Sequence, residues 1–165
     1  MDPSQRYKII AADDEAPIRD VFQKYIDLAG KEDMALLSIV SDGGTLVELA
    51  KYIPAFDLIV TDNEMPGMDG IEAIRELRKL HFKQPAIIAT GRYQRLVDSE
   101  PQDTYRYPAF DNPHSHLPGM YAHLRDDPLT RVIEKPYGGK EIIKFMRELR
   151  DGKLPDQIFE KLAKR

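Results

Sequence analysis

One carboxylate, Asp62, directly follows a segment with the composition of a buried strand. That segment, residues 56–61, is rich in β-branched and aromatic side chains. The residues that come next, 63–70, read Asn-Glu-Met-Pro-Gly-Met-Asp-Gly, and their proline and glycines predict a loop before a helix. Because ligands of open α/β sheets gather beyond the carboxyl ends of the strands, Asp62 is expected at a binding edge.

Polar side chains also follow three other strand-like segments. Asp13 and Asp14 follow residues 7–12, Thr90 follows residues 85–89, and Lys135 follows residues 131–134. If these strands are parallel and adjacent, carboxylates, a hydroxyl and an ammonium group meet at one edge of the sheet. Carboxylates that close cannot all stay ionised unless a cation lies among them. Mg²⁺ is the cation we expect, because it prefers hard oxygen ligands and leaves room for a phosphate.

This combination of side chains fits the transfer of a phosphoryl group to a carboxylate. A carboxylate can act as a covalent nucleophile, and phosphoryl transfer needs mainly positioning and positive charge around the phosphoryl oxygens. Mg²⁺ and Lys135 would supply the charge. The backbone N–H groups of Asn63, Glu64 and Gly91 are candidates for the remaining contacts, because loops after strands present such groups to anions. The sequence has no Walker-type Gly-rich loop, so an activated donor such as a phosphohistidine or an acyl phosphate is expected.

Alternating strand and helix patterns would position these residues. Besides the segments above, we expect a strand at 34–40 and helices at 17–30, from Thr45 to near Pro54, from Asp69 to near His81, and after Gly138 and Gly139. Thr45 with Glu48, and Asp69 with Glu72, have the spacing of capping boxes. This order predicts an α/β fold in which helices cover both faces of a parallel sheet.

The order of these motifs resembles the receiver domain of two-component response regulators. The motifs are Asp13-Asp14, Asp62 followed by residues 65–70 (Met-Pro-Gly-Met-Asp-Gly), Thr90-Gly91 and Lys135-Pro136. The resemblance runs from about Tyr7 to about Arg150 and implies a flavodoxin-like, doubly wound, five-stranded parallel sheet in a three-layer α/β/α arrangement. We also expect a cis peptide bond between Lys135 and Pro136, because the chain must turn sharply there.

The resemblance implies a role for each of these residues. Asp62 would accept a phosphoryl group from a sensor histidine kinase or a phosphotransfer protein, and the domain would catalyse only its own phosphorylation and dephosphorylation. Thr90 would bond the phosphoryl group and Lys135 would pair with it. The Mg²⁺ ligands would be Asp14 and Asp62, Asp13 directly or through a water, and the backbone carbonyl of Glu64.

Two features depart from the family pattern. The interval from Thr90 to Lys135 is longer than one helix with two loops requires, so we expect an insertion at about 92–130. Within it, a short helix near 93–99 and a helical turn around 119–125 are expected, and the spacing of His114 and His116 is interpreted as a solvated loop. Val132 stands where switching receivers usually carry an aromatic residue, and it is interpreted as a core valine. A receiver domain at 1–150 and a short helical tail at 151–165 complete the predicted organisation.

Composition is compatible with a single cytoplasmic domain, and the resemblance implies output through contacts with other proteins. The net charge is −4 and the pI is near 5.6, so a direct nucleic-acid interaction is not expected. There is no cysteine, no apolar run approaching the ~18 residues of a membrane span and no secretory leader pattern, which excludes thiol chemistry and predicts no membrane insertion. The downstream protein is left unidentified, and self-association as a homodimer stays open.

Two other functions are compatible with parts of the pattern. The first is a degenerate receiver that acts as a constitutive protein-binding module and is never phosphorylated. The second is a phosphatase of the haloacid-dehalogenase type, which also has an aspartate nucleophile at a strand end. Such phosphatases carry a second aspartate two residues later and a threonine two residues after that, where this chain has Glu64 and Pro66.

Overall fold

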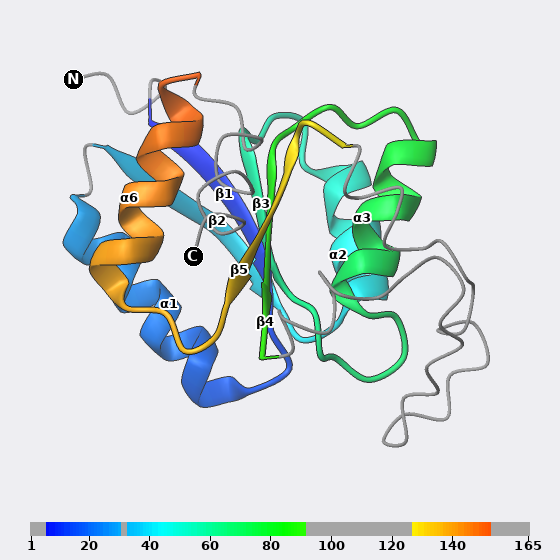
Figure 1. Ribbon diagram of the computed structural model, residues 1–165. Helices are drawn as coiled ribbons and strands as arrows, with labels where there is room; N and C mark the ends of the chain where they lie inside the picture. The colour runs from blue at the N-terminus through cyan, green and yellow to red at the C-terminus, as the bar shows by residue number, and fades with distance from the viewer. Residues whose placement is uncertain (1–5, 31–32, 92–126, 153–165) are drawn as a thin grey trace, which may run out of the picture.

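The computed structural model describes residues 6–30, 33–91 and 127–152, and within them one parallel sheet lies between two layers of helices (Figure 1). The strands are β1 (Tyr7–Ala12), β2 (Met34–Val40), β3 (Leu58–Asp62), β4 (Ala86–Thr90) and β5 (Thr130–Glu134). The helices are α1 (Ala16–Ala29), α2 (Gly43–Tyr52), α3 (Gly70–Lys79) and α6 (Gly139–Arg150). The five strands run in the order β2-β1-β3-β4-β5, which confirms the predicted doubly wound α/β fold.

Each face of the sheet carries its own hydrophobic core. Alternate residues of β1 show the division: Ile10 packs with α2 and α3, whereas Ile9 packs with α1 and α6. All residues of β3 and β4 are buried, as expected for central strands covered on both faces. Figure 1 shows α1 and α6 on one side of the sheet and α2 and α3 on the other. The sheet is therefore a rigid support for the loops at its carboxyl edge.

The strand register brings the predicted site residues to the same edge. Ala12 pairs with Thr61, so the residues that follow β1 lie beside Asp62 at the end of β3. Asp62 in turn pairs with Ala89, which places Thr90 next to the same edge. Thr90 pairs with Glu134, directly before Lys135. The alignment explains why polar residues far apart in the sequence converge.

Two local predictions about the backbone are confirmed, and one predicted helix cap is wrong. The peptide bond between Lys135 and Pro136 is cis, and Gly30 ends α1 with a positive φ of 107°. The expected capping box at Thr45 does not form. Asp42 is the N-cap of α2 instead. The Asp42 carboxylate accepts hydrogen bonds from the backbone N–H of Thr45 at 2.8 Å and from the Thr45 hydroxyl at 2.7 Å. The N-cap lies three residues earlier than predicted because Asp42 satisfies the free N–H groups of the first turn.

Some predicted features lie outside the described residues. These are the helix near 93–99, the turn around 119–125, the loop with His114 and His116, and residues 153–165 of the predicted tail. The chain is described again from Asp127, which leads into β5. There, Arg78 of α3 donates to Asp127 at 2.8 Å and to the Thr130 hydroxyl at 3.2 Å. This ion pair fixes the entry to β5 and therefore the strand that carries Lys135.

The second predicted capping box forms at the start of α3. The Asp69 carboxylate accepts the N–H of Glu72 at 2.7 Å, and the Glu72 carboxylate accepts the N–H of Asp69 at 3.2 Å. Burial raises the pKa of Asp69 to about 7; the N–H of Glu72 opposes this shift, and the charges of Glu72 and Glu64 add to it. The folded protein therefore retains a proton that the unfolded chain releases near pH 4.

This capping aspartate makes stability depend on pH. Because the folded-state pKa is raised, the stabilisation is present at low pH and is lost as the pH rises from about 4 to about 7. Asp69→Asn can still cap the helix but cannot ionise. Its free energy of unfolding relative to wild type should therefore rise by about 1–2 kcal/mol between pH 5 and pH 8. Urea denaturation at both pH values measures this change, with Asp20→Asn as the exposed control. A difference that stays constant with pH would contradict the prediction.

Candidate functional site

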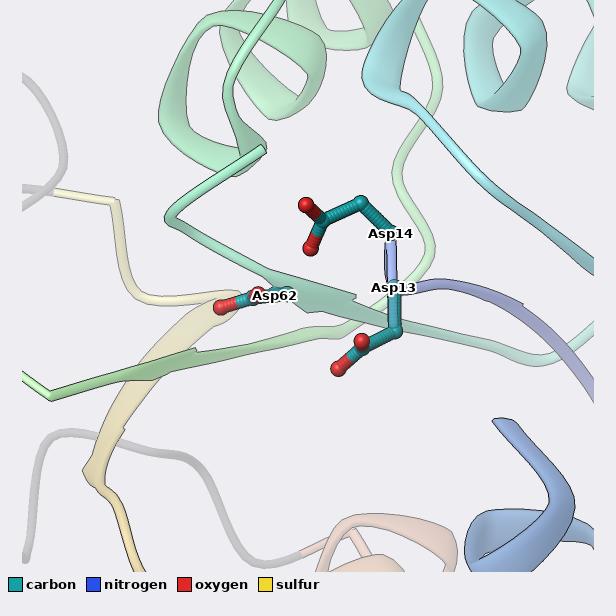
Figure 2. Close-up of side chains that lie close together, drawn as sticks. All are labelled: Asp13, Asp14 and Asp62. Atoms are coloured by element: carbon teal, nitrogen blue, oxygen red, sulfur yellow. The ribbon is translucent and has the colours of Figure 1, made fainter. Parts of the chain in front are cut away.

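Three aspartates lie together at the carboxyl edge of the sheet. Carboxylate oxygens of Asp13, Asp14 and Asp62 all lie within 4.8 Å of one another (Figure 2). Asp62 is the last residue of β3, and the other two follow β1 and turn their carboxylates in different directions. Asp13 and Asp62 are almost entirely buried, with 6% and 4% of their surface exposed. The structure therefore brings together the acidic residues that the sequence predicted.

Lys135 provides the positive charge of this pocket. Its Nζ lies 2.9 Å from Asp62 Oδ1 and 3.6 Å from Asp13 Oδ2. Burial lowers the pKa of Lys135, but the hydrogen bond to Asp62 and the charges of Asp62 and Asp13 together raise it above its usual value. The ammonium group therefore stays charged beside Asp62 throughout the physiological range.

One ammonium group does not balance the carboxylates. Burial raises the pKa of Asp13, and the nearby charges of Asp62 and Asp14 raise it further, while the N–H of Glu15 and the charge of Lys135 lower it. The N–H of Glu15 donates to Asp13 Oδ1 at 2.9 Å. A pocket that holds more negative than positive charge favours either a proton or a bound cation.

The donor set fits Mg²⁺. Mg²⁺ binds oxygen at about 2.0–2.1 Å, so adjacent ligand oxygens lie about 3 Å apart and opposite ones about 4 Å. The oxygens of Asp13, Asp14 and Asp62, which lie within 4.8 Å of one another, would reach that geometry by moving inward around the ion. The predicted contribution of the Glu64 backbone carbonyl stays a prediction.

The Glu64 side chain makes contacts that the sequence analysis did not foresee. The Thr90 hydroxyl donates to Glu64 Oε1 at 2.5 Å, and the N–H of Gly91 donates to Glu64 Oε2 at 3.2 Å. The backbone N–H of Glu64 donates to Asp62 Oδ1 at 3.1 Å, and its predicted contact with a phosphoryl oxygen stays a prediction. Thr90 and Gly91 thus lie at the site, but their donors face a carboxylate of the chain itself.

Asn63 makes contacts that the sequence did not predict. Its backbone N–H donates to the Ala89 carbonyl at 2.8 Å, which extends the pairing of β3 with β4. Its side-chain oxygen accepts the N–H of Ile71 at 3.3 Å, and its carbonyl accepts the N–H of Gly70 at 3.3 Å. The Asn63 N–H is therefore committed to the sheet in this structure, and its predicted contact with phosphate stays a prediction. Asn63 is only 3% exposed, and its hydrogen bonds hold the loop between β3 and α3 in place.

Two further residues lie around the site: Arg19 contacts its backbone, and Val132 belongs to the core. Arg19 of α1 donates to the carbonyl oxygens of Asp13 at 2.8 Å and Asp14 at 2.9 Å, and so holds the backbone of the acidic pair. The sequence offered no signal for Arg19 beyond its place on the predicted helix. Val132 is partly buried and packs against the core beside α2 and α3, as interpreted from the sequence.

The comparisons with known proteins agree with this geometry. The family model of the response regulator receiver domain matches residues 9–100, which is more than half of the chain. A response regulatory domain of protein mrkE from Klebsiella pneumoniae is 17% identical, with a TM-score of 0.62 over 88% of this chain and 96% of that one.

Two other solved structures are similar to the same extent. A LuxR-family DNA-binding response regulator from Staphylococcus aureus is 24% identical, with a TM-score of 0.59 over 86% of this chain and 97% of that one. The receiver domain of RcsB from Salmonella enterica serovar Typhimurium, solved with the phosphomimetic BeF3−, is 17% identical, with a TM-score of 0.64 over 91% and 92%. At these identities the structures show the shared fold, and the family match carries the assignment. The chain belongs to the response regulator receiver domain family, the signalling modules of two-component systems.

Proposed function

We propose that Asp62 accepts a phosphoryl group from a phosphohistidine of a sensor histidine kinase or a phosphotransfer protein, in an Mg²⁺-dependent phosphorelay. The observation that carries this proposal is the contact of 2.9 Å between the Lys135 ammonium and Asp62, within a pocket of three aspartates. A buried carboxylate with a fixed cation on one side and cation ligands on the other is placed to act as a nucleophile toward phosphorus.

Each residue of the site has a separate role in the proposed phosphoryl transfer. An Asp62 oxygen forms the new bond to phosphorus, and the bond from phosphorus to the histidine nitrogen of the donor breaks, so the electron pair leaves with the imidazole. Lys135 and the N–H of Glu64 hold the negative charge around Asp62. Asp13, Asp14 and Asp62 would hold the Mg²⁺, which supplies further positive charge at the phosphoryl oxygens when bound. The Thr90 hydroxyl and the Gly91 N–H are donors for another phosphoryl oxygen.

The proposal also implies where the domain acts and how it passes on the signal. A histidine kinase or phosphotransfer partner implies a cytoplasmic location and an output through contact with a downstream protein. The net charge of −4 gives no general attraction to nucleic acid. Within the ranges that the structure describes, no helix has the length and hydropathy to cross a bilayer.

Acetyl phosphate provides the direct test. Incubation of the wild-type protein with acetyl phosphate and Mg²⁺ should add the mass of one phosphoryl group, because acetate is a leaving group that needs no partner protein. Excess chelator should slow this labelling by about a hundredfold or more, since a metal ion supplies several kcal/mol of charge stabilisation. Intact-mass spectrometry over time measures both rates. No labelling with Mg²⁺ would reject the proposal and favour the constitutive binding module.

A further inference from the structure

The Glu64 carboxylate occupies two donors at the phosphoryl site. Glu64 lies two residues after Asp62, and its two side-chain oxygens accept from the Thr90 hydroxyl and from the Gly91 N–H. Thr90 is completely buried at the end of β4. A single carboxylate therefore forms a two-pronged contact with the end of the strand next to the acceptor.

A phosphoryl group on Asp62 would need the same donors. Asp62 pairs with Ala89 across the sheet, so the hydroxyl and the N–H that follow Ala89 are the donors of β4 nearest to the acceptor edge. The phosphoryl group presents three anionic oxygens, and a carboxylate presents two, so both groups suit charge-assisted hydrogen bonds from these donors. The two anions cannot use them at once.

The Glu64 carboxylate and a phosphoryl group on Asp62 would also repel each other, because both are negatively charged. The pocket already holds three aspartates against the single ammonium of Lys135. A phosphoryl group would add about −1.5 to −2 charges. The Glu64 side chain would then face like charge at close range, and it would move away.

The local structure allows the side chain to leave while its backbone stays. The Glu64 N–H is held by Asp62, and the next residue, Met65, is 2% exposed and anchors the loop in the core. Glu64 itself is only partly buried, so a rotation of its side chain brings the carboxylate to solvent. The movement breaks the hydrogen bonds of the Glu64 side chain to the end of β4, while the backbone hydrogen bond from Asn63 to Ala89 remains.

From these contacts we infer that the Glu64 carboxylate is the resting occupant of the phosphoryl-oxygen site, and that it acts as a brake which phosphorylation of Asp62 must displace. The inference rests on the proposed function and adds a regulatory residue to it. Phosphorylation exchanges one anion for another at Thr90 and Gly91, so the change in structure is concentrated in the released Glu64 side chain and its loop.

Two variants and one control test the inference. Glu64→Gln keeps the shape of the side chain without its charge, and Glu64→Ala removes the occupant altogether; the backbone carbonyl is kept in both. Glu48→Gln makes the same change in net charge at an exposed position on α2, where Glu48 pairs with Lys51. It controls for the general attraction of the acetyl phosphate anion to a less negative protein. Thermal melting checks that each variant folds.

Labelling by acetyl phosphate and Mg²⁺ should be about tenfold faster in Glu64→Ala than in wild type, since the transfer no longer has to break charge-assisted hydrogen bonds. Glu64→Gln should lie between the two, and Glu48→Gln should stay within about twofold of wild type, because exposed charges at a distance are screened. Equal or slower labelling of both Glu64 variants beside a labelled wild type would overturn the inference and leave the proposed function standing. No labelling of any protein would reject both.

A second measurement reads the contact without any phosphodonor. The amide resonance of Gly91 in a ¹H–¹⁵N spectrum should shift in both Glu64 variants, because its hydrogen-bond acceptor is changed or removed, and should stay in place in Glu48→Gln. Addition of beryllofluoride to the protein in the presence of Mg²⁺ should move the same Gly91 resonance. The beryllofluoride concentration needed for this shift should be lower in Glu64→Ala than in wild type. An unchanged Gly91 resonance in both variants would show that Glu64 does not occupy these donors in solution.

Discussion

Asp62→Asn should take up no phosphoryl group from acetyl phosphate, in the same assay in which wild-type protein is fully labelled. The amide has the size of the carboxylate but lacks the anionic oxygen that attacks phosphorus. Its oxygen can still accept from Lys135 and from the N–H of Glu64, so the pocket keeps its shape. Intact-mass spectrometry measures the loss. Asp20→Asn on the exposed face of α1 is the matched control and should be labelled at the wild-type rate.

The same variant also tests the electrostatics of the pocket. Three aspartates share one ammonium, so the removal of one negative charge relieves repulsion between Asp62 and its neighbours. In chelator, Asp62→Asn should therefore be at least as stable as wild type, with a gain of about 1 kcal/mol in the free energy of unfolding. Urea denaturation measures the difference. A clear loss of stability would mean that the ion pair of Asp62 with Lys135 outweighs the repulsion, and labelling of the variant would mean that another residue is the acceptor.

The sequence was sufficient to predict the residues that strands position. Asp62 and Thr90 are the last residues of their strands and Lys135 directly follows β5. The carboxyl ends of parallel strands meet at one edge of a sheet. Once the order and direction of the strands are known, the site follows without any loop geometry. The pairing of Asp13 and Asp14 with this edge follows from the register of β1 with β3 in the same way.

The residues that loops position could not be predicted. Nothing in the pattern shows that the Glu64 side chain reaches Thr90, because its direction depends on the path of the chain between β3 and α3. The N–H of Asn63, which was expected at the phosphate, pairs with Ala89 in this structure, because the ladder between β3 and β4 continues one residue past the strand. The predicted cap of α2 at Thr45 was wrong for a similar reason: the N-cap is Asp42, because its carboxylate accepts the N–H of Thr45.

Gly70 is the residue on which the geometry of this loop depends most. It begins α3, and a Cβ atom at this position would lie 2.2 Å from the carbonyl oxygen of Asp62 and 3.0 Å from its carbonyl carbon. The side chain of Thr61 would also lie 3.0 Å away. These neighbours belong to a central strand, and Asp62 is paired with Ala89, so they cannot easily retreat. Glycine is required here because the helix start approaches the acceptor strand so closely.

Gly70→Ala should therefore cost about 3 kcal/mol of folding free energy, at the upper end of the range for overpacked sites, because the clash is with backbone atoms. For a domain of this size that corresponds to a fall of about 10 °C in the melting temperature. Gly138→Ala is the matched control. Gly138 has a φ of −85° and no atom within 4 Å of an added Cβ, so its melting temperature should stay within a few degrees of wild type.

The folded fraction of Gly70→Ala should also be labelled more slowly than wild type, because relief of the clash moves the Asp62 backbone away from Lys135 and from its partners after β1. Differential scanning calorimetry and the acetyl phosphate assay at low temperature separate the two effects. If Gly70→Ala melted like Gly138→Ala, the start of α3 could move away from β3 without cost, and the rigid placement of Asp62 that the proposed chemistry needs would lose its structural basis.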